Sequence, residues 1–162
     1  MTEANTPSPR AIALPRLVSL QGVRLIRCQS EFVGIQKGDV LEQFKLEMKA
    51  GGRKSPDAPN TVQTFVGLEC AVLPRDHERI VAKVSCDMAL DYLVSDANAF
   101  EELTEDDCAA FASANGVYNA WPYLREFCQT ISLRMLLPAP IILPSLPPSM
   151  RDAKLGCVPK IV

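Results

Sequence analysis

The sequence predicts an α+β protein in which a helix lies on an antiparallel sheet. Three consecutive runs of the chain alternate apolar and polar residues, which is the period of a strand with one wet face. Short segments rich in turn-forming residues separate these runs, as in hairpins. A stripe of apolar residues at helical spacing follows the strands along the chain.

The strands are expected in sequence order. Residues 17–32 have mixed periodicity and form a first candidate strand, and strict alternation begins at 44–49. Residues 50–60 contain Gly, Pro, Asp and Asn, which predicts a loop. Two longer alternating runs, 61–72 and 80–92, flank a turn at Pro74 to His77. The three alternating runs together predict an antiparallel meander with one packed face.

Two helices are expected after the strands. Thr104 followed by Asp107 is typical of a helix N-terminus, and the other acidic residues nearby suit the positive end of its dipole. The Asn-Gly pair at 115–116 is expected to end this helix. Asn119 is expected to cap a second helix with Pro122 in its first turn. The apolar stripe of this second helix consists of Leu124, Phe127, Cys128, Ile131 and Met135.

The length of 162 residues favours one domain. We expect a flexible tail at 1–16, a folded domain at 17–146 and a Pro-rich tail at 147–162. Prolines interrupt the N-terminus, and the chain has no apolar run long enough to span a membrane. These features predict a cytoplasmic protein with no membrane partner.

Charge and cysteine spacing argue against several classes of function. The net charge of −2 gives no electrostatic reason to expect a nucleic-acid partner. None of the six cysteines forms a C-x-x-C pair, so we expect free thiols on apolar positions, no metal site and no cofactor. The cysteines are Cys28, Cys70, Cys86, Cys108, Cys128 and Cys157.

Catalytic motifs are also missing from the sequence, which favours a protein that is not an enzyme. The single histidine, His77, lies in a predicted turn, where a solvated side chain is the common case. Gly51 and Gly52 precede Arg53 and Lys54, as in some phosphate-binding loops, but no helix is predicted to start there. We therefore interpret this segment as a hairpin loop.

One stretch of the second predicted helix has an unusual composition. It begins with Trp121, Pro122, Tyr123, Arg125 and Glu126, and it continues through Arg134 into a Pro-rich apolar exit at 138–146. This run resembles the helical signature of SecB-family chaperones. The resemblance implies a four-stranded antiparallel sheet with helices packed on one face. It also implies a homo-oligomer in which two subunits pair and two pairs stack into a dimer of dimers.

In that family an unfolded client lies in apolar grooves on the outside of the assembly. The resemblance therefore implies two candidate client-binding walls on this chain. The first consists of Phe32, Val40, Leu41, Phe44 and Leu46, and the second of Ile141, Ile142 and Leu146. For Phe44 and Leu46, an ordinary core position fits the alternation equally well.

Oligomerisation is also expected from the pattern of the strands. The face opposite the packed one carries apolar residues that an isolated monomer would leave in water, and large exposed apolar patches are rare on soluble monomers. These residues are Phe65, Ala71, Val81 and Ala89, and Trp121 of the second helix is expected to need cover as well.

The chain departs from the export chaperones of the family. Those relatives place acidic residues near the end of the first strand, where this chain has Gln29 and Val33. Docking to the export motor ATPase is therefore doubtful. The departures favour a divergent branch that includes chaperones guarding the antitoxin of a toxin–antitoxin pair.

The expected function is ATP-independent binding of unfolded or nascent polypeptides, for export or for antitoxin protection. A dedicated escort for one partner protein is the alternative, and an enzyme without a recognisable motif is a third.

Overall fold

The computed structural model describes residues 8–75, 78–145 and 147 of the chain. Its strands are β1 (Val18–Phe32), β2 (Leu41–Lys54), β3 (Thr61–Pro74) and β4 (Ala82–Val94). Its helices are α1 (Pro9–Ala13), α2 (Ala97–Glu102), α3 (Glu105–Phe111) and α4 (Val117–Arg134). A 3₁₀ turn, η1 (Leu14–Arg16), follows α1, and a π-helical turn, η2 (Ala112–Gly116), joins α3 to α4.

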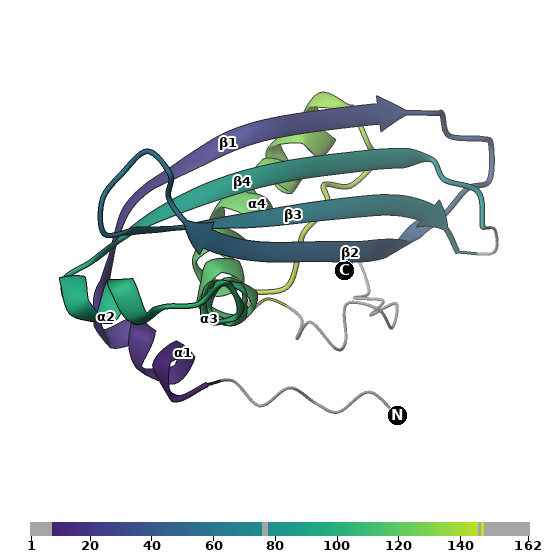
Figure 1. Cartoon of the computed structure of the whole chain (residues 1–162). Coiled ribbons are helices and arrows are strands. Elements are labelled where there is room, and N and C mark those ends of the chain that lie inside the picture. The colour runs from purple at the N-terminus through teal and green to yellow at the C-terminus, as the bar shows by residue number, and fades with distance from the viewer. Residues whose placement is uncertain (1–7, 76–77, 146, 148–162) are drawn as a thin grey trace.

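The four strands form one antiparallel sheet in the order β1-β4-β3-β2. The strands β2, β3 and β4 form the predicted meander, and β1 pairs with β4 at the far edge. Figure 1 shows that the connection from β1 to β2 crosses the end of the sheet, and that α3 and α4 lie on one face of the sheet. The predicted α+β class and helix placement are confirmed.

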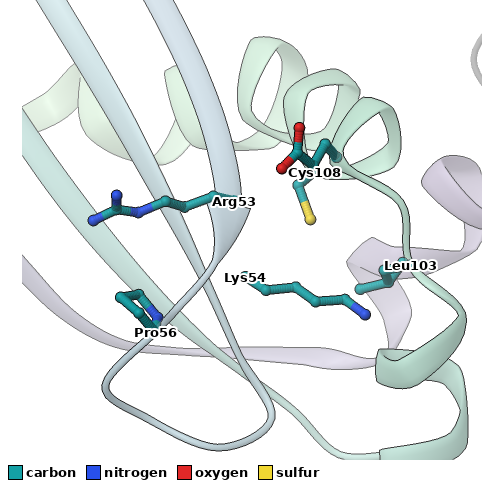
Figure 2. Close-up of a pocket in the computed structure, with 6 residues that line it drawn as sticks. Arg53, Lys54, Pro56, Leu103 and Cys108 are labelled. Carbon is teal, nitrogen blue, oxygen red and sulfur yellow. The ribbon is translucent and has the colours of Figure 1, made fainter.

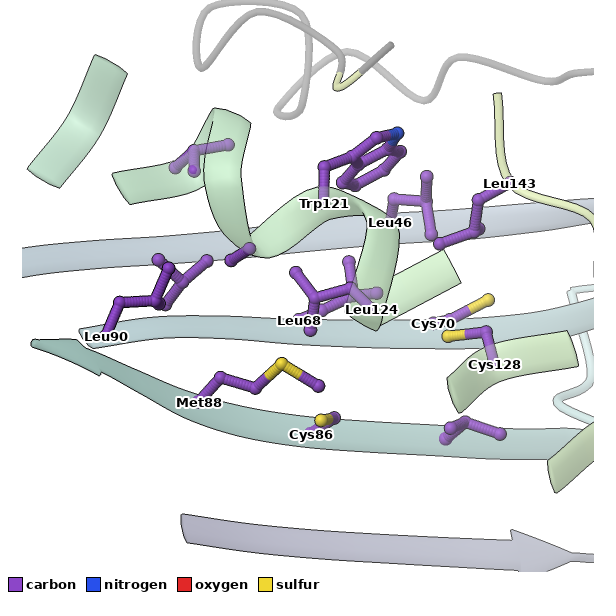
Figure 3. Close-up of a cluster of buried hydrophobic side chains, with 14 of the residues drawn as sticks. Leu46, Leu68, Cys70, Cys86, Met88, Leu90, Trp121, Leu124, Cys128 and Leu143 are labelled. Carbon is purple, nitrogen blue, oxygen red and sulfur yellow. The ribbon is translucent and has the colours of Figure 1, made fainter. Parts of the chain in front are cut away.

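The face of the sheet beneath the helices, here called the inner face, holds the core. In β3 the buried inner residues alternate with half-buried outer ones, as the period-2 pattern predicted. Leu124 and Cys128 of the predicted helical stripe are fully buried against this face (Figure 3). The buried inner residues of β3 are Val62, Thr64, Val66, Leu68, Cys70 and Val72.

Two predicted boundaries are wrong. The loop expected at 50–60 begins only after Lys54, because β2 continues through both glycines and pairs with β3 as far as Lys54 opposite Val62. The helix break expected at 115–116 does not occur. Gly116 has a helical φ of −60° instead of the positive φ of a C-terminal glycine cap. A Cβ at Gly116 would lie 3.0 Å from the hydroxyl oxygen of Thr64, so this glycine allows close packing on β3.

The expectation that Asn119 caps the second helix is also wrong, because α3, η2 and α4 follow one another without a break. Asn119 lies inside α4, and its side-chain amide donates to the hydroxyl of Tyr92 at 3.0 Å. Pro122 likewise lies inside α4 and not in its first turn. The predicted start of α3 is confirmed, because Thr104 and Asp107 form a reciprocal capping box.

Part of the segment expected to be a loose tail is helical. Residues 9–16 form α1 and η1, with Leu14 fully buried in the core. The prolines of this segment occupy the first turns of their helices, where a missing N–H costs no hydrogen bond. Ser8 caps α1 by accepting from the Ala11 amide, and its hydroxyl donates to the Asp107 carboxylate. The other predicted domain limits stay predictions.

Candidate functional site

The signature residues of α4 fix the segment that follows the helix. The indole N–H of Trp121 donates to the carbonyl of Pro144 at 2.9 Å, and Arg125 Nε donates to the carbonyl of Leu143 at 3.1 Å. The hydroxyl of Ser132 accepts from the Ile141 amide at 2.8 Å. Trp121 belongs to the cluster of buried side chains in Figure 3 and is only 1% exposed, so it needs no cover from a second subunit. The helix therefore holds residues 141–144 in an extended path across its own surface.

Along this path, neighbouring residues of the second proposed client wall differ in their exposure to solvent. Ile141 is 2% exposed and Leu143 is also buried, whereas Ile142 between them is 56% exposed. Ile141 is thus a core residue, and its assignment to a client wall is corrected. Alternation of an extended backbone explains the difference, because successive side chains point to opposite sides. Leu146 lies outside the described residues.

The remaining signature residues lie on the outer side of α4. Pro122, Tyr123 and Glu126 are exposed. Together with Leu20 of β1 and Tyr118, Pro122 and Tyr123 line a pocket of about 310 Å³. A pocket lined by tyrosine rings and an apolar strand residue suits an apolar side chain of another polypeptide.

The residues of the first proposed client wall also divide into buried and exposed ones. Phe44 and Leu46 lie on the inner face of β2, opposite Val72 and Cys70, and are fully buried. They are core residues, so their assignment to a client wall is corrected. Leu41 is half-buried at the start of β2.

Phe32 and Val40 are the exposed members of that wall, at 47% and 48%. They flank the connection between β1 and β2, and three further exposed apolar residues extend the surface. We call this surface the loop patch; it consists of Phe32, Val33, Ile35, Val40 and Ile80. Val33, Ile35 and Ile80 were not predicted as binding residues. For Val33 and Ile35 a usable signal was present, because these apolar residues lie outside any strand or helix period in a Gly-containing connection. Ile80 belongs to the predicted strand at 80–92, so the sequence pattern did not mark it as a binding residue.

Both ends of the connection at 33–40 are attached to the sheet. The amide of Val33 donates to the carbonyl of Val81 at 2.8 Å, and the amide of Arg75 donates to the carbonyl of Val40 at 2.9 Å. The loop patch is therefore displayed at the end of the sheet by a segment held to the β3–β4 connection.

The inner side of β1 forms a second exposed apolar surface, here called the β1 lane. Its residues share the face of Leu90, Met88 and Cys86 of β4 by register. The core of the chain lies beneath α4, which packs on β3 and β4, and leaves this edge strand largely uncovered. The β1 lane consists of Leu20, Leu25 and Cys28, all exposed.

The outer face of the sheet carries several ion pairs. Arg24 pairs with Asp91, Arg27 with Asp87 and Lys83 with Glu69, at 2.8, 2.7 and 2.6 Å. The Arg53 guanidinium lies 5.0 Å from the centre of the half-buried Phe65 ring and covers it. Two residues expected to be exposed on this face, Val81 and Ala89, are already buried in the single chain. The β1 lane and the loop patch are therefore two apolar surfaces that the single chain leaves exposed, and Ile26 of β1 and Leu93 of β4 are exposed as well.

A pocket of about 260 Å³ with two cationic residues in its lining lies between the end of β2 and the start of α3 (Figure 2). Lys54 donates to the carbonyl of Glu101 at 2.9 Å, and Arg53 donates to the Gln63 side chain at 3.0 Å. The two cationic side chains of this pocket, Lys54 and Arg53, therefore already form hydrogen bonds within the chain. Burial raises the pKa of the Cys108 thiol, which keeps it protonated and a poor nucleophile.

Residues 8–75, 78–145 and 147 hold no group of three His, Cys, Asp or Glu side chains placed to bind a metal ion. None of the helices in these ranges has the length and hydropathy needed to cross a membrane. His77 lies outside the described residues.

The chain has a SecB-like fold. Its structure matches the SecB-like chaperone of Mycobacterium tuberculosis, solved in complex with a ChAD peptide from the HigA1 antitoxin, with a TM-score of 0.70. The two chains are 20% identical, and the match covers 85% of this chain and 96% of the other. The predicted resemblance in fold is confirmed.

A second solved structure, a protein of unknown function from Streptococcus agalactiae, matches with a TM-score of 0.43. It is 10% identical, and the match covers 78% of this chain and 96% of that one. No family model matches the sequence, and no curated protein matches it significantly.

Proposed function

We propose that this protein is an ATP-independent chaperone that binds unfolded polypeptides and keeps them from aggregating. The observation that carries the proposal is the loop patch, in which five large apolar side chains are exposed on the two connections at one end of the sheet and on the adjoining end of β1. Exposed apolar residues that gather at one end of a folded chain are typical of an interaction site. An unfolded polypeptide offers the apolar side chains that such a surface would bury.

Two further features support a polypeptide ligand. Ile142 presents an apolar side chain from an extended segment that α4 holds by hydrogen bonds. The tyrosine-lined pocket beside Leu20 offers a separate site for an apolar side chain. Binding at several separated sites along an extended client gives affinity without a strict sequence requirement.

The structural neighbour favours one class of client. It was solved with a peptide from an antitoxin, and we propose that an antitoxin segment is a natural client of this chain. A dedicated escort for that one partner is the alternative to a general chaperone. Suppression of aggregation for several unrelated denatured proteins supports the general role, and protection of one client alone supports the escort.

We also propose that the chain forms a homo-oligomer, with the part of the β1 lane around Leu25 and Cys28 in the contact between subunits. Leu25 is 51% exposed in the single chain and lies on an edge strand whose outer backbone edge has no neighbour in the sheet. Edge strands of this kind favour pairing with a second strand. The dimer of dimers stays a prediction.

The test of client binding uses Ile142→Asp and Val40→Asp. A carboxylate must lose its water to bind an apolar client but costs little on a wet surface. Each variant should therefore weaken binding of denatured client on the order of 10-fold or more, with an unchanged unfolding temperature.

The matched control is Leu93→Asp, which places the same charge on an exposed leucine of the outer face of β4. It should bind client like the wild type. Unfolding caused by Ile142→Asp would mean that residue 142 is core. Full binding by both test variants would place the client elsewhere on the molecule.

A further inference from the structure

The guanidinium of Arg79 joins two points of the connection between β1 and β2. One terminal nitrogen donates to the carbonyl of Gly34 at 2.9 Å, and the other forms an ion pair with the carboxylate of Asp39. Arg79 itself belongs to the connection between β3 and β4. The bridge therefore ties the two connections at this end of the sheet to each other.

Asp39 is the centre of this arrangement. Its side chain is 5% exposed, and the carboxylate oxygen that meets Arg79 also accepts from the Gln36 amide at 2.7 Å. The Asp39 amide in turn donates to the carbonyl of Gln36 at 3.1 Å. A carboxylate with so little water around it depends on its partners, because a buried charge without its counter-ion is strongly unfavourable.

The connection between β1 and β2 contains no helix or strand that would fix its backbone conformation. Gly34 and Gly38 have φ values of 126° and 99°, which side chains with a Cβ rarely adopt. Two such residues within one connection allow many alternative backbone paths in the absence of external contacts. The Arg79 bridge supplies contacts at both ends of the glycine-containing part.

The exposed apolar residues are sequence neighbours of the bridged ones. Ile80 follows Arg79, Val40 follows Asp39, and Val33 and Ile35 flank Gly34. Each residue that takes part in the polar bridge is thus next in sequence to at least one residue of the loop patch. Loss of the bridge would therefore release the backbone beside the apolar side chains, which would then be held only by hydrogen bonds such as those at Val33 and Val40.

We infer that Arg79 is a positioning residue for polypeptide binding, which holds the loop patch in one conformation ready to receive a client. This inference rests on the proposed function. A surface that is already ordered loses less conformational entropy on binding, so its affinity is higher than that of the same residues on a mobile loop. The polar bridge and the apolar patch then form one functional unit.

The test compares Arg79→Ala with the wild type in binding a reduced, carboxymethylated protein that stays unfolded. We expect the dissociation constant to rise about 10-fold. We also expect amide hydrogen exchange to accelerate at 33–40 and to stay unchanged in β3 and α4. Arg79→Lys keeps the charge beside Asp39 but lacks the forked donor, and it should give intermediate values of both quantities.

The matched control is Arg27→Ala, which removes an arginine from an exposed ion pair with Asp87 on the outer face. It should leave both client affinity and exchange at 33–40 unchanged. If Arg79→Ala does not fold, Arg79→Lys and Asp39→Asn carry the test. Unchanged affinity in the folded variants overturns the role of Arg79 alone. Failure of the wild type to bind any unfolded client overturns the proposed function, and this inference with it.

Discussion

Gly52 of β2 lies directly against the backbone of Cys108 in α3. A Cβ on residue 52 would lie 2.8 Å from the carbonyl carbon of Cys108, closer still to its oxygen, and 3.2 Å from Cβ of Ala112. The helix can approach the strand this closely only because residue 52 has no side chain. Gly51, one position earlier, points to the outer face and meets nothing within 4 Å.

Gly52→Ala should therefore destabilise the protein by about 1–3 kcal/mol, because a rigid backbone has to move to admit the methyl group. Gly51→Ala should change the free energy of unfolding by less than about 0.5 kcal/mol, as an ordinary surface substitution does. Chemical denaturation of the two variants measures the difference. Equal effects would show that α3 can shift away from β2 at no cost.

Stability should fall at low pH through Asp107. Hydrogen bonds from the Ser8 hydroxyl and the Thr104 backbone lower the pKa of the Asp107 carboxyl from its usual 3.8. Because the folded pKa is below the unfolded one, the stabilisation is present above pH 3.8 and is lost as pH falls through the folded pKa. Ser8→Ala should reduce stability at neutral pH and flatten this acid dependence. A parallel shift of the whole pH profile would contradict the assignment.

The cysteines should differ sharply in reactivity. Burial raises the pKa of Cys86 and of Cys128 to about 12, and Figure 3 shows Cys128 of α4 beside Cys70 of β3 in the core. At pH 8 only about one thiol in ten thousand with this pKa is a thiolate, the reactive form. Cys28 is exposed in the single chain. It should therefore react first with an aromatic disulfide reagent in the Leu25→Asp variant, in which no second subunit covers the β1 lane.

The assay uses a Cys157→Ser background, because Cys157 lies outside the described residues. Replacing Cys28 by Ser should then remove the fast phase, and the other thiols should react only after denaturant is added. A fast phase that survives Cys28→Ser would mean that a core cysteine is accessible in solution.

The β1 lane should hold subunits together. Light scattering should show a mass that is a multiple of the 17.7 kDa chain. Leu25→Asp should shift the protein toward the monomer, because a charge at an apolar contact must lose its water. Leu93→Asp on the outer face should leave the mass unchanged. A monodisperse monomer for the wild type at micromolar concentration would contradict the predicted oligomer.

Weak binding to the export motor ATPase also follows from Gln29 and Val33. Both are exposed, at the end of β1 and in the loop patch, and neither carries the acidic charge of the export chaperones. Rim charges mainly raise association rates with a basic partner. Micromolar binding to the motor that weakens steeply with added salt would contradict this prediction.

Local patterns determined the strands and the helix start. The alternation in 61–72 defined the buried face of β3, because successive side chains of any strand point to opposite sides. Thr104 and Asp107 defined the start of α3, since a capping box needs only residues three positions apart. The apolar stripe through Leu124 and Cys128 located the side of α4 that packs on the sheet.

Tertiary contacts decided the rest. Phe32 and Phe44 both occupy inner-face positions of strands, yet Phe32 is exposed on one edge of the sheet and Phe44 is buried on the other. Strand order and helix placement make this difference, and neither is a local property. Gly116 has helical φ and lies against Thr64, which is distant in sequence, so the need for a glycine here comes from packing and not from a helix end. The pairing of Arg79 with Asp39 spans forty residues of sequence separation, so only the folded chain brings the loop patch and its polar bridge together.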